Sequence, residues 1–261
     1  MNLGLDGKRA IVGGATSGLG RATAVALADE GCNLVLWSSS QEHLDETAHM
    51  LSSRTSVSVT TVSADAKKPD TASRVAEAAL AGGDVDIVVL NAGGPPPVDP
   101  TATTPEGWSA ALQMLTLTPI MLATALLPGM RERGFGRVLA VLSSGVVEPI
   151  PNLAYSNAGR SALAAWLKTV SVEVAADGVT VNGVLPGRFD TPRVAALDRA
   201  RAQSTGTSEA DVRAASEQSI PAGRYGDPAE FGAFVAMLAS TASGYITGRM
   251  HAADGGMLKS Y

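Results

Sequence analysis

Glycines are concentrated in one short segment near the amino end of the chain, in the run Gly13-Gly14-Ala15-Thr16-Ser17-Gly18-Leu19-Gly20. An apolar run precedes this segment and an alanine-rich run follows it, which predicts a strand, a tight turn and a helix. Glycine lets the backbone approach a pyrophosphate closely, and the free N–H groups at a helix N-terminus attract the anion. The segment therefore predicts a dinucleotide-binding turn, with a merely flexible turn as the alternative. The residues expected to contact the ligand are Gly14, Ser17, Gly18, Leu19 and Gly20.

The second apolar run ends at Trp37-Ser38-Ser39-Ser40, where a dinucleotide-binding fold often places a charged residue. A carboxylate at this point would bind the ribose 2′-hydroxyl of NAD and repel the 2′-phosphate of NADP. No acidic residue stands there, and no Arg or Lys that would clamp a phosphate. The hydroxyls of Ser38 and Ser39 can contact a phosphate, although serines after a strand are often only turn formers. The segment favours NADP(H) over NAD(H) and leaves NAD(H) as the alternative.

Short apolar runs alternate with longer runs of helical periodicity along the whole chain. Strands are expected at 9–13, 33–37, 57–63, 87–91, 138–143, 180–185 and 249–253. Helices are expected at 21–30, 41–53, 71–81, 106–130, 152–176 and 228–238. Several strands are continuously apolar, which is typical of parallel strands covered on both faces. The alternation predicts an α/β fold of the Rossmann type, a doubly wound parallel sheet of about seven strands with helices on both faces.

One charged segment, at about 188–223, interrupts this alternation between the last two strands. Long insertions at the carboxyl edge of such a sheet usually cover the substrate. We therefore expect a single domain over 1–261 with a substrate lid at about 188–223. The composition of the lid names no substrate.

The composition of the 261 residues excludes several classes of protein. The net charge of −5 and the absence of any Lys/Arg block argue against nucleic-acid binding. No continuous apolar run approaches the ~20 residues of a membrane span, and the first residues do not resemble a signal peptide. We therefore expect a cytoplasmic protein without membrane contact. The single cysteine, Cys32, excludes an internal disulfide and is expected to be a buried apolar side chain, and the scattered histidines predict no metal site.

The motifs, in this order, resemble those of the short-chain dehydrogenase/reductase family over essentially the whole chain. Gly14, Gly18 and Gly20 match the family's Gly-x-x-x-Gly-x-Gly turn, with Gly13 where threonine is usual. The further positions that match cofactor contacts are Asp65 and Ala66 beside the adenine, Asn91, Ala92 and Gly93 after the fourth strand, and Pro186, Gly187 and Thr191 beside the nicotinamide. The resemblance implies the Rossmann fold and a nicotinamide dinucleotide cofactor.

The resemblance also implies a catalytic set of Asn, Ser, Tyr and Lys, the last two spaced as Tyr-x-x-x-Lys on one helix. That spacing stacks both side chains on one face, where the ammonium lowers the pKa of the phenol. Ser143 is assigned to the serine position, with neighbouring Ser144 as the less favoured candidate, and Tyr155 to the tyrosine position. On this assignment Gly159 replaces the lysine and Leu115 replaces the asparagine.

A long cation stands one position after Gly159, at Arg160. Its guanidinium is the alternative to the lysine, although a spacing of five residues turns its stem away from the face of Tyr155. The resemblance is greatest to a 3-oxoacyl-carrier-protein-reductase-like subgroup with an imperfect catalytic set.

The expected activity is therefore that of an NADP(H)-preferring oxidoreductase acting on a small-molecule carbonyl or alcohol. Tyr155 would be the general acid and Ser143 would polarise the carbonyl. The alternative is a protein of the same fold that has lost hydride transfer and serves as a dinucleotide-binding sensor, a partner subunit or a non-redox enzyme. The resemblance also implies a homo-oligomer, a tetramer or a dimer, assembled through the long helices 106–130 and 152–176.

Overall fold

The computed structural model describes residues 2–260 and contains one seven-stranded sheet. The strands are β1 (Arg9–Gly13), β2 (Asn33–Ser38), β3 (Val59–Ser63), β4 (Ile87–Leu90), β5 (Gly136–Val141), β6 (Val179–Pro186) and β7 (Met250–Ala253). Their order is β3-β2-β1-β4-β5-β6-β7, and every neighbouring pair is parallel. The predicted Rossmann-type sheet is confirmed.

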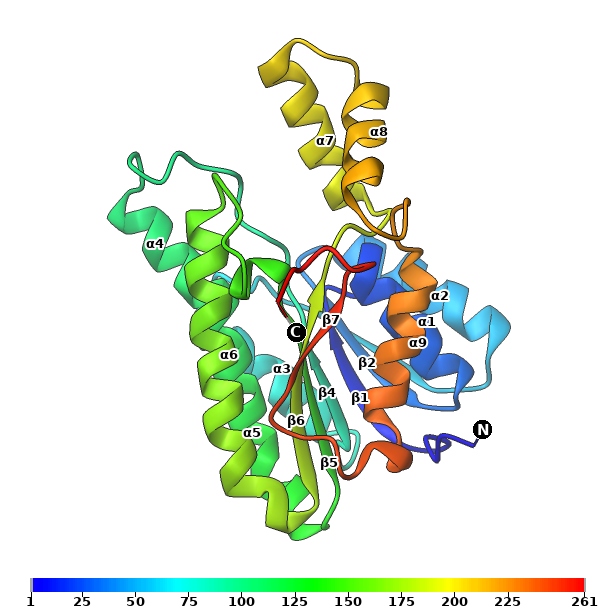
Figure 1. Cartoon of the computed structure of the whole chain (residues 1–261). Helices are drawn as coiled ribbons and strands as arrows, with labels where there is room; N and C mark the ends of the chain where they lie inside the picture. Colours follow the sequence, from blue (N-terminus) through cyan, green and yellow to red (C-terminus); the bar gives the residue numbers. More distant parts are fainter. Residues whose placement is uncertain (1, 261) are drawn as a thin grey trace.

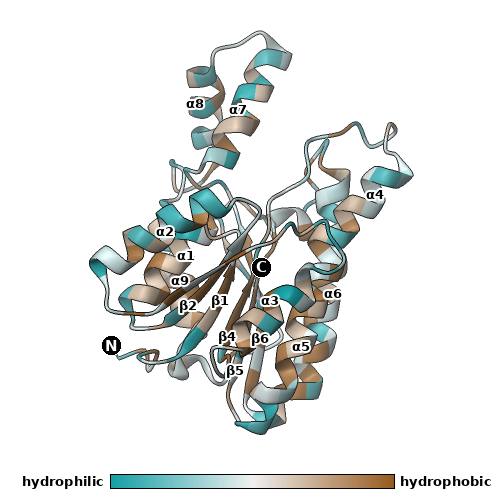
Figure 2. Cartoon of the chain, turned by 180° about the vertical axis from the view of Figure 1, so that it is seen from behind, coloured by the Kyte–Doolittle hydropathy of each residue, from teal (hydrophilic) through white to brown (hydrophobic). Residues whose placement is uncertain are grey.

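Helices cover both faces of the sheet (Figure 1). On one face lie α1 (Gly18–Asp29), α2 (Gln41–Arg54) and α9 (Pro228–Ala239), and on the other α3 (Thr71–Leu80), α5 (Thr118–Glu132) and α6 (Ala154–Val174). β4 is buried at every position, and β5 likewise, because helices pack on both sides of them. Figure 2 shows the resulting pattern, with hydrophobic strands between helices whose outer surfaces are more hydrophilic.

The long helix predicted at 106–130 is interrupted. It consists of α4 (Pro105–Leu112), a π-helix (Gln113–Leu117) and α5. Pro119 lies in the first turn of α5 and has no N–H to donate to the carbonyl four residues earlier, so the preceding turn does not continue as a regular α-helix. The whole run Pro105–Glu132 is long and apolar enough to cross a membrane, but 56% of its most apolar stretch is buried inside the fold.

The charged segment expected to be a lid, 188–223, contains α7 (Pro192–Thr205) and α8 (Glu209–Ser219). The two helices form a hairpin that projects beyond the carboxyl edge of the sheet (Figure 1). Thr191 begins α7 by accepting a hydrogen bond from the Val194 N–H at 3.3 Å, and Gly206 ends it at a φ of 68°. Its role as a lid stays a prediction.

The topology creates a crevice at one point of the carboxyl edge. β1 and β4 are neighbours at the middle of the sheet, and the chain proceeds outward from them in opposite directions. In open α/β sheets such a switch point leaves room for a ligand between the loops that follow the two strands. Here those loops begin at Gly14 and Asn91.

Candidate active site

A cavity of about 600 Å³ opens at this switch point. All of the predicted cofactor residues except Asp65 and Ala66 line it. They are Gly14, Ser17, Gly18, Leu19, Gly20, Ser38, Ser39, Asn91, Ala92, Gly93, Pro186, Gly187 and Thr191. The sequence-based selection therefore converges on one cleft, because the carboxyl ends of β1, β2, β4 and β6 meet there.

The glycine-rich turn is shaped by close contact with the end of β4. The Asn91 side-chain amide donates a hydrogen bond to the Gly13 carbonyl at 2.9 Å. A Cβ at Gly13 would meet the Asn91 carbonyl oxygen and, at 2.9 Å, the Trp37 ring. Gly14 has a φ of 56°, which strains any residue with a side chain. The close approach of the Asn91 carbonyl and of the Trp37 ring thus explains the glycine at position 13, where the family that the sequence resembles usually has threonine.

Helix α1 begins at Gly18 and directs its N-terminus at the cleft. Within the described chain, Ser17 at its N-cap makes no side-chain hydrogen bond to the first turn. The first N–H groups of α1 are therefore available to an anion, and the helix dipole adds to the attraction. The turn and the helix end together form a cradle that fits a pyrophosphate.

The three serines at the end of β2 have different structural roles. Ser38 and Ser39 line the cleft, and the Ser38 hydroxyl lies 3.3 Å from that of Thr16. Ser40 is the N-cap of α2 and accepts a hydrogen bond from the His43 N–H. Ser40 is thus a helix-capping residue, whereas the other two present hydroxyls to a ligand.

Asp65 and Ala66 lie outside the lining of the cleft. The Asp65 carboxylate accepts the N–H of Lys67 at 3.0 Å, and the Ala66 carbonyl accepts the Thr118 hydroxyl at 2.9 Å. Both residues therefore have local partners in the loop after β3. Their contact with an adenine remains a prediction.

Ser143 follows β5 and lines the cleft together with Ser144. The Ser143 hydroxyl accepts the N–H of Gly145 at 3.0 Å and begins a short 3-10 helix. Because its oxygen is occupied as an acceptor, its O–H remains free to donate to a ligand oxygen.

Tyr155 does not reach this cleft. Its hydroxyl accepts the backbone N–H of Thr104 at 2.9 Å, at the beginning of α4. Its ring packs edge-on against Trp108 with centroids 4.8 Å apart, and the residue is only 7% exposed. The phenol is absent from the cleft lining because the helix turns it toward α4. This corrects the assignment of Tyr155 as the general acid.

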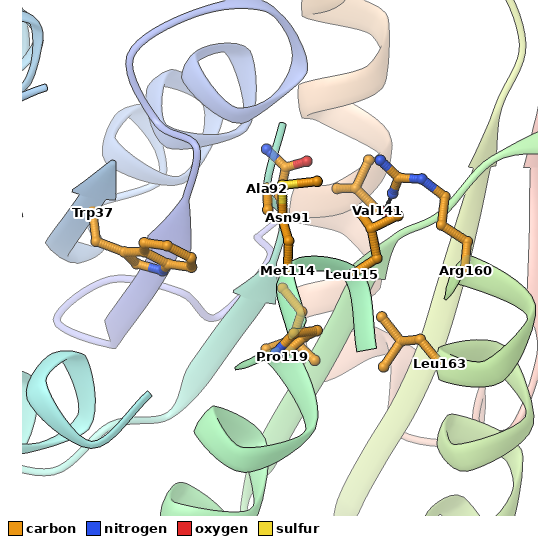
Figure 3. Close-up of a pocket in the computed structure, with 10 residues that line it drawn as sticks. Trp37, Asn91, Ala92, Met114, Leu115, Pro119, Val141, Arg160 and Leu163 are labelled. Carbon is orange, nitrogen blue, oxygen red and sulfur yellow. Dashed lines mark hydrogen bonds between the residues drawn. The ribbon is translucent and has the colours of Figure 1, made fainter. Parts of the chain in front are cut away.

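Ser156 and Arg160 face the cleft instead. They stand four residues apart on α6, and the Arg160 Nε lies 3.4 Å from the Ser156 hydroxyl. The Arg160 Nη1 donates to the Val141 carbonyl at 2.6 Å, at the end of β5. Figure 3 shows the guanidinium extending from α6 toward Val141 and the end of β4, where Asn91 and Ala92 lie.

Positive charge predominates along the cleft. Among residues 2–260, Arg160, Arg188 and Arg193 line it, against one carboxylate, Glu148. Arg188 is paired with Asp198 at 2.7 Å. Burial and, to a smaller extent, the charge of Arg193 lower the pKa of the Arg160 guanidinium to about 10. Arg160 stays protonated at neutral pH, as does Arg193, whose pKa burial also lowers.

Comparison with known proteins identifies the family. Residues 14–258 match the family described as enoyl-(acyl carrier protein) reductase. Dehydrogenase/reductase SDR family member 4 of Sus scrofa is 33% identical over 260 residues, which cover 97% of this chain and 88% of that protein. The chain belongs to the short-chain dehydrogenase/reductase (SDR) family.

Bacterial relatives and solved structures agree with this membership. The 3-oxoacyl-[acyl-carrier-protein] reductase FabG of Vibrio cholerae is 32% identical, over 98% of this chain and 99% of its own. The crystal structure of L-sorbose reductase from Gluconobacter frateurii, in complex with NADPH and L-sorbose, superposes with a TM-score of 0.95 at 30% identity, covering 100% of both chains. YwfH, an NADPH-dependent reductase involved in bacilysin biosynthesis, superposes with a TM-score of 0.92 at 26% identity, over 98% of this chain and 100% of its own.

Against the SDR pattern, this chain retains the spacing of Tyr-x-x-x-Lys but not its residues. Ser156 and Arg160 have the four-residue interval and share one face of α6. Sequence reasoning missed this pair because it placed the tyrosine position on Tyr155, one residue earlier. The available signal was a hydroxyl followed four residues later by a long cation, Ser156-x-x-x-Arg160.

Leu115 and Gly159, which the sequence analysis assigned to the asparagine and lysine positions, pack against each other. A Cβ at Gly159 would lie 3.0 Å from the Cβ of Leu115, which is buried in the π-helix. The Thr116 hydroxyl donates to the Gly159 carbonyl at 2.9 Å. The glycine therefore allows α6 to approach the π-helix closely. It does not replace a lysine of the cleft.

Proposed function

We propose that this SDR protein is an NADP(H)-preferring oxidoreductase that transfers hydride between the nicotinamide cofactor and a small carbonyl or alcohol substrate. The observation that carries the proposal is the continuity of the cleft. At one end it has the glycine turn and the open N-terminus of α1, and at the other Ser143, Ser156 and Arg160. A cofactor held at the first end can extend to the second.

The preference for NADP(H) is proposed from the lining after β2. Ser38 and Ser39 offer hydroxyl donors, and within residues 2–260 no carboxylate lines the cleft beside them. The one lining carboxylate, Glu148, belongs to the loop after β5 and accepts the Lys259 N–H at 3.0 Å. The NADPH found with the L-sorbose reductase supports the same choice.

The reaction is proposed to use hydroxyls and a guanidinium in place of a phenol and an ammonium. The bound cofactor would supply or accept the hydride. Ser143 and Ser156 would donate hydrogen bonds to the substrate carbonyl oxygen, and Arg160 would stabilise the negative charge that develops on it. In reduction the Ser156 hydroxyl would give its proton to that oxygen and be reprotonated from solvent, and in oxidation the proton would leave by the reverse route. A serine hydroxyl is a weaker acid than a phenol, so we expect slower reduction than in relatives that have the Tyr-Lys pair.

The test compares Ser156→Ala with Tyr155→Phe in NADPH-dependent reduction of a panel of ketones and aldehydes. Ser156→Ala is expected to lower kcat about 10-fold or more, because a donor to the developing oxyanion is lost. Tyr155→Phe is expected to keep kcat and to lose about 0.5–1.5 kcal/mol of stability, because the partly buried hydrogen bond from the Thr104 N–H to the phenol oxygen is lost. The reverse pattern, with kcat lost only in Tyr155→Phe, would restore Tyr155 as the acid.

A second candidate function is dinucleotide binding without hydride transfer. It is favoured by one observation, that no tyrosine or lysine among the described residues lines the cleft. It predicts that NADPH binds and that no member of the carbonyl panel is turned over. In that case Ser156→Ala would leave NADPH affinity unchanged.

We also propose that the protein forms a homo-oligomer and is located in the cytoplasm. Exposed apolar side chains at Leu117 and Met121 on one long helical run, and at Val172 on α6, support assembly into a homo-oligomer through these helices. The absence of disulfide pairing at the single Cys32 agrees with the proposed cytoplasmic location.

A further inference from the structure

Two guanidinium groups enter the cleft from two different helices. Arg160 comes from α6, and Arg193 from the first turn of α7. Each donates a short hydrogen bond to a backbone carbonyl, Arg160 to Val141 at 2.6 Å and Arg193 to Pro95 at 2.7 Å. A guanidinium has five N–H donors, so these bonds leave further donors on both side chains.

Neither group has a carboxylate partner within residues 2–260. The third arginine of the cleft shows the contrast, because Arg188 is neutralised by Asp198 and contacts the Tyr225 hydroxyl. Arg160 and Arg193 are close enough for the charge of Arg193 to lower the pKa of Arg160. Two like charges in a partly buried cleft repel each other, and an anion bound between them would offset that cost.

Within the described residues 2–260, no side-chain carboxylate lies between these two guanidinium groups. Glu148, the one carboxylate of the lining, accepts the backbone N–H of Lys259. The phosphates of a dinucleotide already have the glycine turn and the N-terminus of α1. A second ligand of the cleft, beside the dinucleotide, can therefore supply this counter-charge.

The surrounding side chains leave room for a small acid. Ser143 and Ser156 are short, so they do not screen Arg160 from the cleft. The rest of the substrate end is mostly apolar and is lined by Ile150, Leu153, Leu197, Met257 and Leu258. This combination suits a compact molecule with one charged end and a short apolar body.

We propose that Arg160 and Arg193 bind a carboxylate of the substrate, so that the protein acts on small oxo- or hydroxy-acids. The inference rests on the proposed oxidoreductase function, since it names the substrate class of the same site. Arg160 would hold the carboxylate with N–H donors that it does not direct at the reacting carbonyl oxygen, and Arg193 would contact the carboxylate from α7. Guanidinium groups suit this role because they form paired, charge-assisted hydrogen bonds to carboxylates.

The test uses acetoacetate and its neutral ester, methyl acetoacetate, which present the same ketone with and without the charge. Each is titrated calorimetrically into NADPH-saturated protein. Wild type is expected to bind the acid about 10-fold or more tightly than the ester, the range that a charged hydrogen bond supports. Arg193→Gln is expected to abolish that preference while NADPH affinity stays within about twofold.

The matched control is Arg199→Gln, on the same helix. Arg199 is exposed, pairs with Glu209 at 3.2 Å and lies outside the cleft lining. This variant should retain the full preference for the acid. Burial at the cleft affects the Arg193 guanidinium, but the residue as a whole is exposed, so its substitution leaves the buried core intact.

Three results would overturn the inference. The first is an equal response to acid and ester in wild type, including no detectable binding of either. The second is a preference for the acid that survives Arg193→Gln. The third is weakened NADPH binding in that variant with the acid preference unchanged, which would assign Arg193 to the cofactor phosphates.

The same titrations on cofactor-free protein separate this inference from the proposed function. A preference for the acid that depends on Arg193, in a protein that does not bind NADPH, would support the carboxylate site and remove the oxidoreductase. NADPH binding without any preference for the acid would retain the proposed oxidoreductase and rule out the carboxylate site.

Discussion

At the scale of single residues, two adjacent positions of α6 differ in whether their side chains reach the cleft. Adjacent residues on a helix point about 100° apart. Tyr155 is therefore turned against Trp108, while Ser156 faces the cleft with Arg160. The sequence-based prediction placed the tyrosine in the cleft because tyrosine is the residue that the family uses. The rotation of α6 depends on its packing against neighbouring helices, which no local pattern encodes.

Introducing the family's tyrosine and lysine at Ser156 and Arg160 tests whether these two positions face the reacting groups. Ser156→Tyr with Arg160→Lys places a phenol and an ammonium at the two positions that face the cleft. We expect the double variant to reduce carbonyl substrates at least ~10-fold faster than wild type, since general acid catalysis typically contributes ~10²–10⁴-fold. The measurement is the loss of NADPH absorbance with the carbonyl panel.

The matched control is Gly159→Lys, which places a lysine four residues after Tyr155. This change also forces a Cβ against Leu115. It should lose stability and gain no activity. A rate increase in Gly159→Lys that the double variant does not show would support Tyr155 as the acid.

At the scale of elements, the contact between α6 and the π-helix sets the position of the cleft wall. We expect Gly159→Ala to lower the free energy of unfolding by about 1 kcal/mol. The added Cβ meets the Cβ of Leu115 at 3.0 Å, and this overpacking, typically ~1–3 kcal/mol, outweighs the ~1 kcal/mol gain in helix propensity. Urea unfolding measures the difference.

A double-mutant cycle tests whether the contact with Leu115 causes the loss of stability in Gly159→Ala. Leu115→Ala removes the Cδ1 that lies 3.2 Å from the added Cβ and leaves the smaller residue room to shift, so the two changes together should cost less than the sum of their separate costs. Stabilisation by Gly159→Ala alone would show that the contact is loose.

Most elements were predictable because local signals agree with the tertiary structure. The apolar runs became strands, and the glycine turn and Asn91 met because parallel strands end at one edge. The π-helix was missed because Pro119 lies inside an otherwise helical apolar pattern. Arg193 was missed because its position over the cleft depends on the direction in which α7 leaves the sheet.

At the scale of the whole molecule, Cys32 reports on global unfolding, since it is the one cysteine of the chain. Its side chain is buried and its Sγ donates to the Leu5 carbonyl at 3.4 Å. Burial, followed by nearby carboxylates such as Asp86, raises the pKa of the thiol from 9.0 to about 12. We expect native protein to resist iodoacetamide at about pH 8 and to react only as it unfolds.

The same shift predicts how stability depends on pH. The folded-state pKa is raised, so the contribution is complete below the unfolded value of 9.0 and is lost as the pH rises toward about 12. A Cys32→Ala variant should lack this part of the alkaline decline. Rapid alkylation of the native protein would instead show that the thiol is accessible without unfolding.

The most direct test of the central claim is a calorimetric titration of the purified protein with NADPH and then with NADH. The account predicts binding of NADPH at micromolar or lower Kd, and at least ~10-fold weaker binding of NADH, because the serines after β2 replace the acid that selects NAD. Gly14→Val, which strains the turn at its positive φ, should abolish the binding in a folded sample. Failure of folded wild type to bind either nucleotide would contradict the account at its centre.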